Sequence, residues 1–380
     1  MKVGIVVPFS WSFWGGVVEH AEHQARTLRR LGIDTRTIIG NDPPGTFTRF
    51  LHPRSGRHGE PPADVIPVGR SVIVPANGSL PNIVLSPSTP FKIKRVLARE
   101  RFDVLHLHEP MTPAICVSTL AYARCPIVAT FHAAGHLGWH VIGLPMWGFL
   151  MDRIDQRIAV SEQARESVAK WQPAEYDVIP NGVQIPPVAD PANRQNHVVF
   201  IGRHDPRKGM PVLLHAWPEV HRRTGARLRL VGADPLAVRL VMARGRVAEA
   251  GIDVLGWLSD DELTAELLSA RVLTAPSTGQ ESFGMVLTRA FACATPVVAS
   301  DIAGYRAVVE PGTGLLVPPG DASALADALV ALLEDEPRRR SFGEAARKLA
   351  VDRYAWTDIV RRLAAIYERL CADASVAEAA

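Results

Sequence analysis

The sequence predicts an α/β protein with two doubly wound domains, each built on a parallel sheet. Short runs rich in Val, Ile and Leu alternate with helix-length segments along the whole chain. The runs lack the strict polar and apolar alternation of a half-exposed strand, which is typical of strands buried between helices on both faces. They fall into two series, and each series is long enough for one doubly wound sheet.

The expected strands and the segment between the two series define the domains. A stretch rich in Pro, Asn and Gly runs from residue 179 to residue 193 and is typical of a linker. We therefore expect an N-terminal domain over residues 1–178 and a C-terminal domain over residues 179–354. The expected strands of the first series are residues 3–7, 35–39, 104–107, 127–131 and 157–160, and those of the second are 198–201, 227–231, 253–255, 272–275, 297–299 and 314–317.

The last part of the chain has the apolar spacing of an amphipathic helix. Its apolar positions include Trp356, Ile359, Val360 and Leu363, which fall on one face at helical spacing. We expect this helix, over residues 355–371, to return to the N-terminal domain. The tail from residue 372 to 380 is expected to be frayed.

The composition narrows the class of protein. The 380 residues are 47% hydrophobic and 21% charged, with a net charge of +3, which is globular and too mildly basic to favour nucleic acid. The four cysteines form no C-x-x-C pair, so we expect reduced thiols in a cytoplasmic protein rather than disulfides or a zinc frame. The start of the chain predicts a buried strand and not a signal peptide.

The segment from Glu281 to Val286 carries the clearest chemical signal. It follows the expected strand 272–275 and opens a helix, whose free N–H groups attract an anion. Gly284 allows a ligand to approach the backbone. A carboxylate repels phosphate but binds hydroxyl groups, so Glu281 beside an anion site predicts a ligand with both a sugar and a phosphate.

A basic loop follows the expected strand 198–201. Arg203 can bind phosphate in a bidentate manner, Lys208 adds a compact charge, and Arg207 lies between them. The loop lies at the carboxyl end of a strand, where open α/β sheets bind their ligands. We interpret it as an anion clamp, and the alternative is a solvated basic loop.

Two features of the first domain also lie at the carboxyl ends of expected strands, where open α/β sheets bind their ligands. Gly15 and Gly16 lie between the first strand and the first helix, without the G-x-G-x-x-G pattern of nicotinamide dinucleotide sites. His132 ends strand 127–131, and His106 and His108 are expected to share one face of the neighbouring strand. The alternatives are a simple tight turn and a structural histidine. A zinc site from these histidines is disfavoured, because no metal-ligand spacing on a helix supports it.

Two segments are candidates for contact with an anionic membrane. Residues 90–101 predict a basic amphipathic helix, and residues 137–151 are apolar with two tryptophans. The alternatives are a core-facing helix with a solvated basic side and a buried core segment.

Taken in order, these motifs resemble the retaining glycosyltransferases of family 4. The set comprises Gly15-Gly16, Phe131-His132, the loop 202–209 and the segment 281–284. The resemblance spans essentially the whole chain and implies the GT-B fold, in which two Rossmann-like domains face a central cleft. Within the family the chain is most similar to the phosphatidylinositol mannosyltransferases of actinobacteria, on residues 102–110, 127–132, 207–210 and 279–284.

The resemblance implies a role for each motif residue. His132 would bind the transferred sugar, Arg203 and Lys208 would stabilise the departing diphosphate, and Glu281 would hold sugar hydroxyls. No metal and no cofactor beyond a GDP- or UDP-linked sugar are implied. The remaining donor-binding positions would be Gly15, Gly16, Arg207, Leu258, Asp260, Ser282, Phe283, Gly284, Met285, Val286 and Arg289.

The sequence departs from the family at two places. Arg289 stands where the family has a glutamate that contacts the ribose, and a guanidinium can only donate hydrogen bonds. Ribose binding is then expected to weaken or to use another residue, with Arg289 contacting phosphate or an acid. On the acceptor side, Phe9, Ala76 and Asn82 replace tyrosines and arginines, while Asn77 and Ser79 are retained. The lost cations weaken the case for phosphatidylinositol itself.

We expect a retaining, metal-independent hexosyltransferase, with mannose from GDP-mannose as the donor sugar. The acceptor would be a hydroxyl of a lipid or polyol, reached by a protein peripheral on the inner face of the cell membrane. The alternatives are a family 4 enzyme that uses a UDP-sugar and a soluble acceptor, and a catalytically silent sugar-nucleotide-binding protein. A hydrolysing epimerase of the same overall fold is a more distant alternative.

Overall fold

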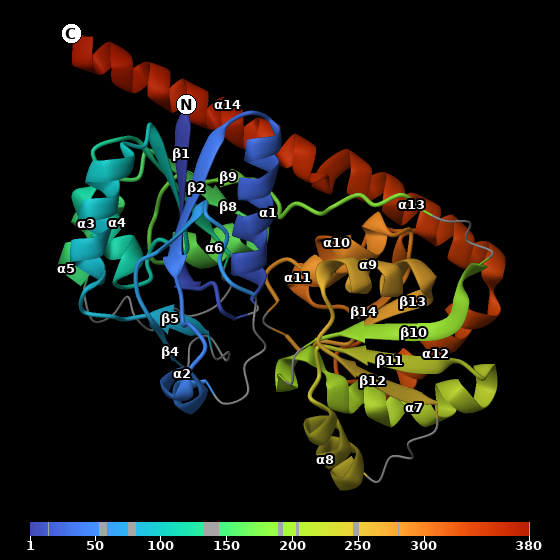
Figure 1. The fold of residues 1–380 in the computed structure, drawn as a ribbon. Coiled ribbons are helices and arrows are strands. Elements are labelled where there is room, and N and C mark those ends of the chain that lie inside the picture. Colours follow the sequence, from blue (N-terminus) through green and yellow to red (C-terminus); the bar gives the residue numbers. More distant parts are fainter. Residues whose placement is uncertain are drawn as a thin grey trace. The chain divides into compact units, whose positions relative to one another are not determined.

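The computed structural model describes residues 1–13, 15–52, 59–74, 81–132, 144–188, 193–202, 205–245, 251–279 and 281–379. The chain forms two compact units (Figure 1). Unit 1 comprises Met1–Gly182 together with Trp356–Ala380, and unit 2 comprises Val183–Ala355.

Unit 1 is built on a sheet of nine strands among the described residues. Seven of them are parallel neighbours in the order β3-β2-β1-β6-β7-β8-β9, and the antiparallel pair β4 and β5 joins β1 through Phe9 and Ile83. The five strands predicted in this half of the chain are all present. The strands are β1 (Lys2–Ser10), β2 (Asp34–Gly40), β3 (Val65–Pro67), β4 (Ser71–Ile73), β5 (Asn82–Val84), β6 (Val104–His108), β7 (Ile127–Phe131), β8 (Gln156–Ala159) and β9 (Asp177–Val178).

Helices cover both faces of this sheet. Figure 1 shows α1 (Gly16–Arg30) and α14 (Trp356–Ala379) on one face, and α3 (Thr89–Glu100), α4 (Ile115–Tyr122) and α5 (Leu144–Met151) on the other. The two remaining helices are α2 (Thr46–Leu51) and α6 (Glu162–Ala169). The strands are apolar without alternation because they are buried from both sides.

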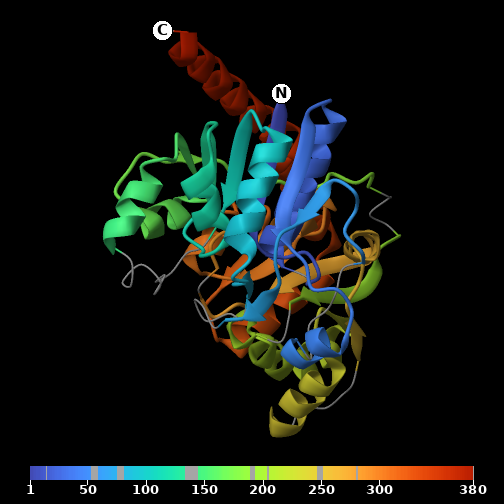
Figure 2. The ribbon, with the colours of Figure 1, turned by 60° about the vertical axis from the view of Figure 1, so that its left-hand side comes forward.

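The C-terminal helix completes the core of unit 1. Trp356, Ile359, Val360, Leu363 and Tyr367 are buried in one cluster with β1 and α1, as their spacing predicts. The expectation of a frayed tail is wrong, since α14 runs to Ala379 and its end extends past the sheet (Figure 2). The residues after 370 are rich in alanine, which has the highest helix propensity.

Unit 2 has a six-stranded parallel sheet in the order β12-β11-β10-β13-β14-β15. Its winding direction reverses between β10 and β13, as in a Rossmann-type sheet, and ligands of such sheets bind at the carboxyl ends of these two strands. All six strands predicted in this half are present. They are β10 (Gln195–Ile201), β11 (Arg227–Val231), β12 (Ile252–Gly256), β13 (Ala270–Ala275), β14 (Val297–Ser300) and β15 (Gly314–Val317).

The helices of unit 2 also form two layers. Figure 1 shows α7 (Met210–Thr224), α8 (Pro235–Gly245) and α12 (Ala322–Glu334) on one face, with α9 (Asp260–Ser269) and α10 (Met285–Ala292) on the other. A short 3₁₀ turn (Pro206–Lys208) precedes α7, and α11 (Ala303–Arg306) and α13 (Glu336–Tyr354) complete the unit. Among the described residues, no helix has both the length and the apolar character needed to cross a bilayer.

Candidate active site

Two helices of unit 2 start at glycines without a capping side chain. In the described part of the chain, nothing caps α7 at Gly209 or α10 at Gly284, and both glycines have positive φ, 71° and 81°. The other helices of the unit, apart from the four-residue α11, are capped by Asp234, Ser259, Asp321 and Asp335. Because α7 and α10 follow the adjacent central strands β10 and β13, their free N–H groups lie along one edge, which suits an anion.

The loops that precede these two helices are in contact. The Thr278 N–H donates to the Arg207 carbonyl over 2.8 Å. A Cβ atom on Gly209 would lie 1.8 Å from the Pro276 carbonyl oxygen, so only glycine fits there. The basic loop and the segment leading to Glu281 therefore form one continuous surface.

This contact brings Lys208 and Glu281 together. The Lys208 Nζ lies 2.6 Å from the Glu281 Oε1, and the two side chains keep 26% and 16% of their exposure. Arg207 makes a similar ion pair with Asp205 at 2.6 Å. A cation for phosphate and a carboxylate for hydroxyls are thus adjacent and partly accessible. Arg203, the third predicted cation, lies outside the described residues.

Tyr305 packs beneath this surface, and it was not predicted from the sequence. Its hydroxyl hydrogen-bonds the Ser277 hydroxyl at 2.8 Å, and its ring lies 2.8 Å from where a Cβ on Gly284 would be. Burial raises the pKa of Tyr305 well above its usual range, so the hydroxyl stays neutral. Phe283 points into the unit against Tyr354, with ring centroids 5.6 Å apart.

Arg289 pairs with an acid. Its Nη2 lies 2.9 Å from the Asp260 Oδ1, and the two side chains are 18% and 43% exposed. Of the expected fates for this departure from the family, the structure therefore shows the ion pair. Asp260 and the half-buried Leu258 are both predicted donor-binding residues. The ion pair therefore joins two of the predicted donor-binding residues, Arg289 and Asp260. Ser282, Met285 and Val286 are half-buried at the start of α10.

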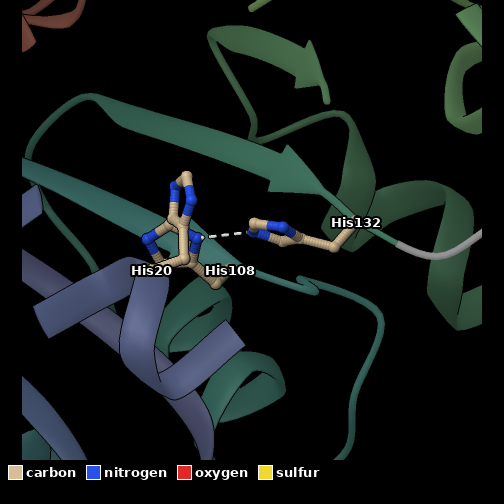
Figure 3. Close-up of side chains that lie close together, drawn as sticks. All are labelled: His20, His108 and His132. Atoms are coloured by element: carbon tan, nitrogen blue, oxygen red, sulfur yellow. Dashed lines mark hydrogen bonds between the residues drawn. The ribbon is translucent and has the colours of Figure 1, made fainter. Parts of the chain in front are cut away.

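Unit 1 gathers four buried histidines at the carboxyl ends of its central strands. His106 and His108 do share one face of β6, with stacked rings 4.8 Å apart. The His108 Nδ1 lies 2.9 Å from the His132 Nε2 (Figure 3). His20, on the first turns of α1, is the fourth, with ring centroids 4.9 Å from His132 and 5.3 Å from His108. His20 was missed from sequence, although a helix opening at Gly16 places residue 20 one turn further on.

Burial keeps these histidines neutral. It lowers the pKa of His106 and of His132 to about 3, and repulsion from His132 contributes to the lowering at His106. The same causes hold the pKa values of His20 and His108 well below their usual range. A neutral imidazole has one donor and one acceptor nitrogen. His132 is thus suited to a neutral hydroxyl rather than to a phosphate.

The cluster is held by a hydrogen-bond network that reaches the C-terminal helix. The His106 Nε2 lies 2.6 Å from the Thr130 hydroxyl, and its Nδ1 is hydrogen-bonded to the Tyr367 hydroxyl. The Gln24 side-chain amide donates to Tyr367 over 2.9 Å. The His132 N–H donates to the Glu109 Oε1 at 2.9 Å, which fixes the backbone where β7 ends.

The remaining predicted residues of unit 1 are less tightly defined. Gly15 caps α1 in an extended conformation with no capping side chain in the described part of the chain, and an added Cβ there would meet nothing within 4 Å. Space therefore remains beside Gly15. Phe9 lies in β1, half-buried against the core of the unit. Asn77 and Ser79 lie outside the described residues.

The candidate membrane segments differ in what they expose. The apolar side of α3 is used in the core, since Ile93 and Val96 are buried, while its basic side chains and Phe91 are exposed, Phe91 at 80%. Residues 137–143 are not among those described, and the rest of the second segment forms α5. There Leu150 and Met151 are buried and Phe149 is 73% exposed.

Comparisons with solved structures agree with this architecture. The sucrose-phosphate synthase of Thermosynechococcus elongatus superposes with a TM-score of 0.76 at 21% identity, covering 98% of this chain and 100% of that one. The Anabaena protein Alr3699/HepE in complex with UDP gives 0.70 at 20% identity, over 97% and 100% of the two chains. These similarities show that the chain has the GT-B fold of glycosyltransferases.

Comparisons of sequence make the assignment finer. Residues 14–185 match the family described as Glycosyltransferase Family 4, and residues 195–335 match Glycosyl transferases group 1. The phosphatidyl-myo-inositol mannosyltransferase of Mycobacterium tuberculosis (strain ATCC 25618 / H37Rv) is 38% identical over 97% of both chains. That of Mycobacterium leprae (strain TN) is 35% identical over 100% of both. The chain belongs to glycosyltransferase family 4, and it is a glycosyltransferase.

Proposed function

We propose that the protein transfers mannose from GDP-mannose to a hydroxyl of a phosphatidylinositol-like lipid, with retention of configuration and without a metal. The observation that carries the donor side is the uncapped pair of helix N-termini beside Lys208 and Glu281. The sugar and the lipid are suggested by the mycobacterial relatives, which are named phosphatidyl-myo-inositol mannosyltransferase. This chain matches them over nearly their full length.

In this proposal unit 2 binds the sugar nucleotide. The diphosphate lies against the N–H groups of α7 and α10, and Lys208 leaves Glu281 to contact it. Glu281 is then free to accept from sugar hydroxyls. Arg203 adds a second cation where negative charge develops on the departing diphosphate. Preorganised positive charge then stabilises the leaving group, as a metal ion does in other transferases.

Unit 1 supplies the group that contacts the transferred sugar. The neutral His132 accepts from or donates to a sugar hydroxyl, and the backbone at Gly15 and Gly16 faces the diphosphate. The bond to the diphosphate breaks ahead of attack, and the acceptor hydroxyl enters from the same face.

We further propose that α3 provides peripheral contact with the cytoplasmic face of an anionic membrane. Its exposed Lys92, Lys94, Arg95 and Arg99 give electrostatic attraction of about 1 kcal/mol per side chain near such a surface. The apolar residues of this helix are already packed in unit 1, so the contact is mainly electrostatic, with Phe91 available for insertion.

One observation favours a second candidate, a protein that binds sugar nucleotides without transferring sugar. The carboxylate expected to hold the ribose is replaced by Arg289, which is occupied by Asp260. This candidate predicts nucleotide binding with neither transfer nor hydrolysis of the donor.

The decisive experiment measures mannose transfer from GDP-mannose to phosphatidylinositol in anionic vesicles, after a thermal-shift comparison of GDP, UDP and ADP. Lys208→Met and Glu281→Gln should each lower kcat by about 10²- to 10³-fold, because they remove charge used in the transition state. The matched control is Lys348→Met, an exposed ion-paired lysine on α13 in the same unit, which should leave the rate unchanged. Full activity of the Lys208 and Glu281 variants would overturn the proposal, and binding without turnover in the wild type would favour the silent protein.

A further inference from the structure

Three of the buried histidines have the arrangement of ligands around one metal ion. The ring centroids of His20, His108 and His132 are 4.9, 5.2 and 5.3 Å apart (Figure 3). With zinc–nitrogen bonds of about 2.0–2.1 Å and tetrahedral angles, three imidazole centroids are expected roughly 5.2 Å apart. One nitrogen from each ring also lies within 4.8 Å of the others.

The nitrogen atoms need only a small adjustment to ligate. The His108 Nδ1 and His132 Nε2 are 2.9 Å apart, while two ligands of a tetrahedral zinc ion are separated by about 3.4 Å. Opening this pair by about half an ångström, with the shared proton moved to the other nitrogen of the same ring, replaces one hydrogen bond with two metal–nitrogen bonds. The three rings come from α1, β6 and the end of β7, all within unit 1.

A second observation that favours a bound ion is an unpaired nitrogen atom in the cluster. The His20 Nδ1 is fully buried and has no hydrogen-bond partner among the described residues. An unpaired buried polar atom costs about 1–3 kcal/mol, which a ligand can recover.

The surroundings favour a borderline transition metal over a hard cation. Imidazole nitrogens suit zinc, copper or nickel, whereas calcium and magnesium prefer oxygen ligands. The buried carboxylate of Glu109 accepts from the backbone N–H of His132, so an acidic side chain contacts one of the three residues. Three protein ligands leave a fourth position for water or another small ligand.

We propose that His20, His108 and His132 bind one zinc-type divalent ion, and that this ion competes with the donor sugar. The competition rests on the proposed function, because it assumes that His132 contacts the sugar. A His132 nitrogen bonded to a metal is no longer available to a hydroxyl group. The site is therefore inhibitory and has no part in transfer.

The test uses tag-free, metal-free protein titrated with Co²⁺, whose visible absorption reports a tetrahedral nitrogen site. We expect one ion per chain and an X-ray absorption spectrum that shows three imidazole ligands in the wild type. His20→Gln and His108→Gln should weaken binding by at least about 10- to 100-fold. The control His23→Gln alters a buried histidine on the same helix and should bind as the wild type does.

The outcomes separate the two proposals. Absence of Co²⁺ binding in the wild type, or binding that persists in both His20→Gln and His108→Gln, would overturn the metal site whether or not transfer occurs. The X-ray absorption measurement on the wild type still decides if a variant fails to fold. Metal binding that leaves the GDP-mannose affinity unchanged would overturn the competition and, with it, the proposed sugar contact of His132.

Discussion

At the residue scale, charged side chains of the candidate donor site are paired with one another. Lys208 is held by Glu281 and Arg289 by Asp260, while both pairs keep some exposure. Partly exposed pairs of this kind contribute only about 0–1 kcal/mol. A diphosphate or sugar can therefore displace one partner without a large loss of stability.

Arg289 is the residue at which we expect a reversal of charge to improve ribose binding most. Arg289→Glu, made together with Asp260→Asn to avoid repulsion, places an acceptor where the family has its ribose-binding glutamate. We expect the preference for GDP over 2′,3′-dideoxy-GDP to rise by about tenfold or more, because hydrogen bonds to charged groups are worth about 1.5–3 kcal/mol. Isothermal titration with both nucleotides measures the ratio, and the single change Asp260→Asn is the control. An unchanged ratio would mean that position 289 does not reach the ribose.

Several candidate residues could be placed from the sequence because they lie in segments that follow expected strands. His132 comes directly after β7, and Lys208 and Glu281 lie in the loops after β10 and β13, whose carboxyl ends are adjacent in the sheet of unit 2. His20 and Tyr305 were not predictable in this way, since their places depend on how α1 and α11 pack onto other elements. The pairing of Arg289 with Asp260 likewise depends on the contact between α9 and α10.

At the element scale, the glycines that open α7 and α10 hold two loops against each other. Gly209 has the left-handed conformation of a helix cap, and it also lies directly against the Pro276 carbonyl. Its role is therefore steric as well as conformational. Gly225, at the other end of α7, has nearly the same φ of 63° but meets nothing within 4 Å.

This difference gives a matched pair of substitutions. Gly225→Ala should destabilise unit 2 by about 1–2 kcal/mol, the cost of a left-handed alanine. Gly209→Ala should add about 1–3 kcal/mol for the clash and should also weaken nucleotide binding, because the loops must separate. Urea unfolding and nucleotide titration measure the two effects. Equal losses in the two variants would contradict the steric role of Gly209.

The histidine cluster makes the stability of unit 1 depend on pH. The folded-state pKa values of His106 and His132, about 3, lie below the ordinary value of 6.5. Below pH 6.5 the unfolded chain takes up protons that the folded chain does not, so stability is lost as pH falls from 6.5 toward 3. Each histidine contributes a slope of up to about 1.4 kcal/mol per pH unit.

Unfolding free energies at pH 7.5, 6.5 and 5.5 measure this slope. His106→Gln should reduce the slope by up to about 1.4 kcal/mol per pH unit, which corresponds to one proton, because Gln does not titrate. His221→Gln, which changes a partly buried histidine of unit 2, is the control and should leave the slope for unit 1 as it is. If His106→Gln leaves the slope unchanged, His106 does not stay neutral in the folded protein as its lowered pKa predicts.

The strands that were predicted and those that were not differ in a physical way. Strands buried on both faces, such as β1 and β10, are continuous apolar runs that the sequence displays. By contrast β3, β4, β5 and β9 have only two or three residues each and depend on neighbours for their hydrogen bonds. Such short segments carry too few residues for a period to be visible.

At the scale of the whole molecule, unit 1 is made from two separated parts of the chain. Its core cluster includes Trp356, Ile359, Val360, Leu363 and Tyr367 from the last helix. Each buried apolar side chain of this size contributes about 1.5–3 kcal/mol, and together they match the total stability of about 5–15 kcal/mol that a domain has. The linker pattern indicated two domains, but only the helical period of the last segment indicated this return.

Truncation tests whether the stability of unit 1 depends on α14. A chain ending at residue 355 should lose the cooperative unfolding of unit 1 and become sensitive to protease there, whereas unit 2 should still melt as a unit. A chain ending at residue 371 keeps the buried face of α14 and should melt within about 2–4 °C of the full protein, the shift that about 1 kcal/mol produces. Calorimetry and limited proteolysis distinguish these outcomes. Native-like melting of unit 1 in the shorter chain would contradict a structural role for α14.

The return of α14 also sets an order of events during synthesis. Domains generally fold as the ribosome releases them, with the N-terminal one first. Here the first unit to be translated lacks part of its core until residues 356–367 have emerged. Unit 2, which is continuous in the chain, can therefore finish folding before unit 1. For most of translation the first 182 residues expose an apolar surface, on which a chaperone can act until the last helix arrives.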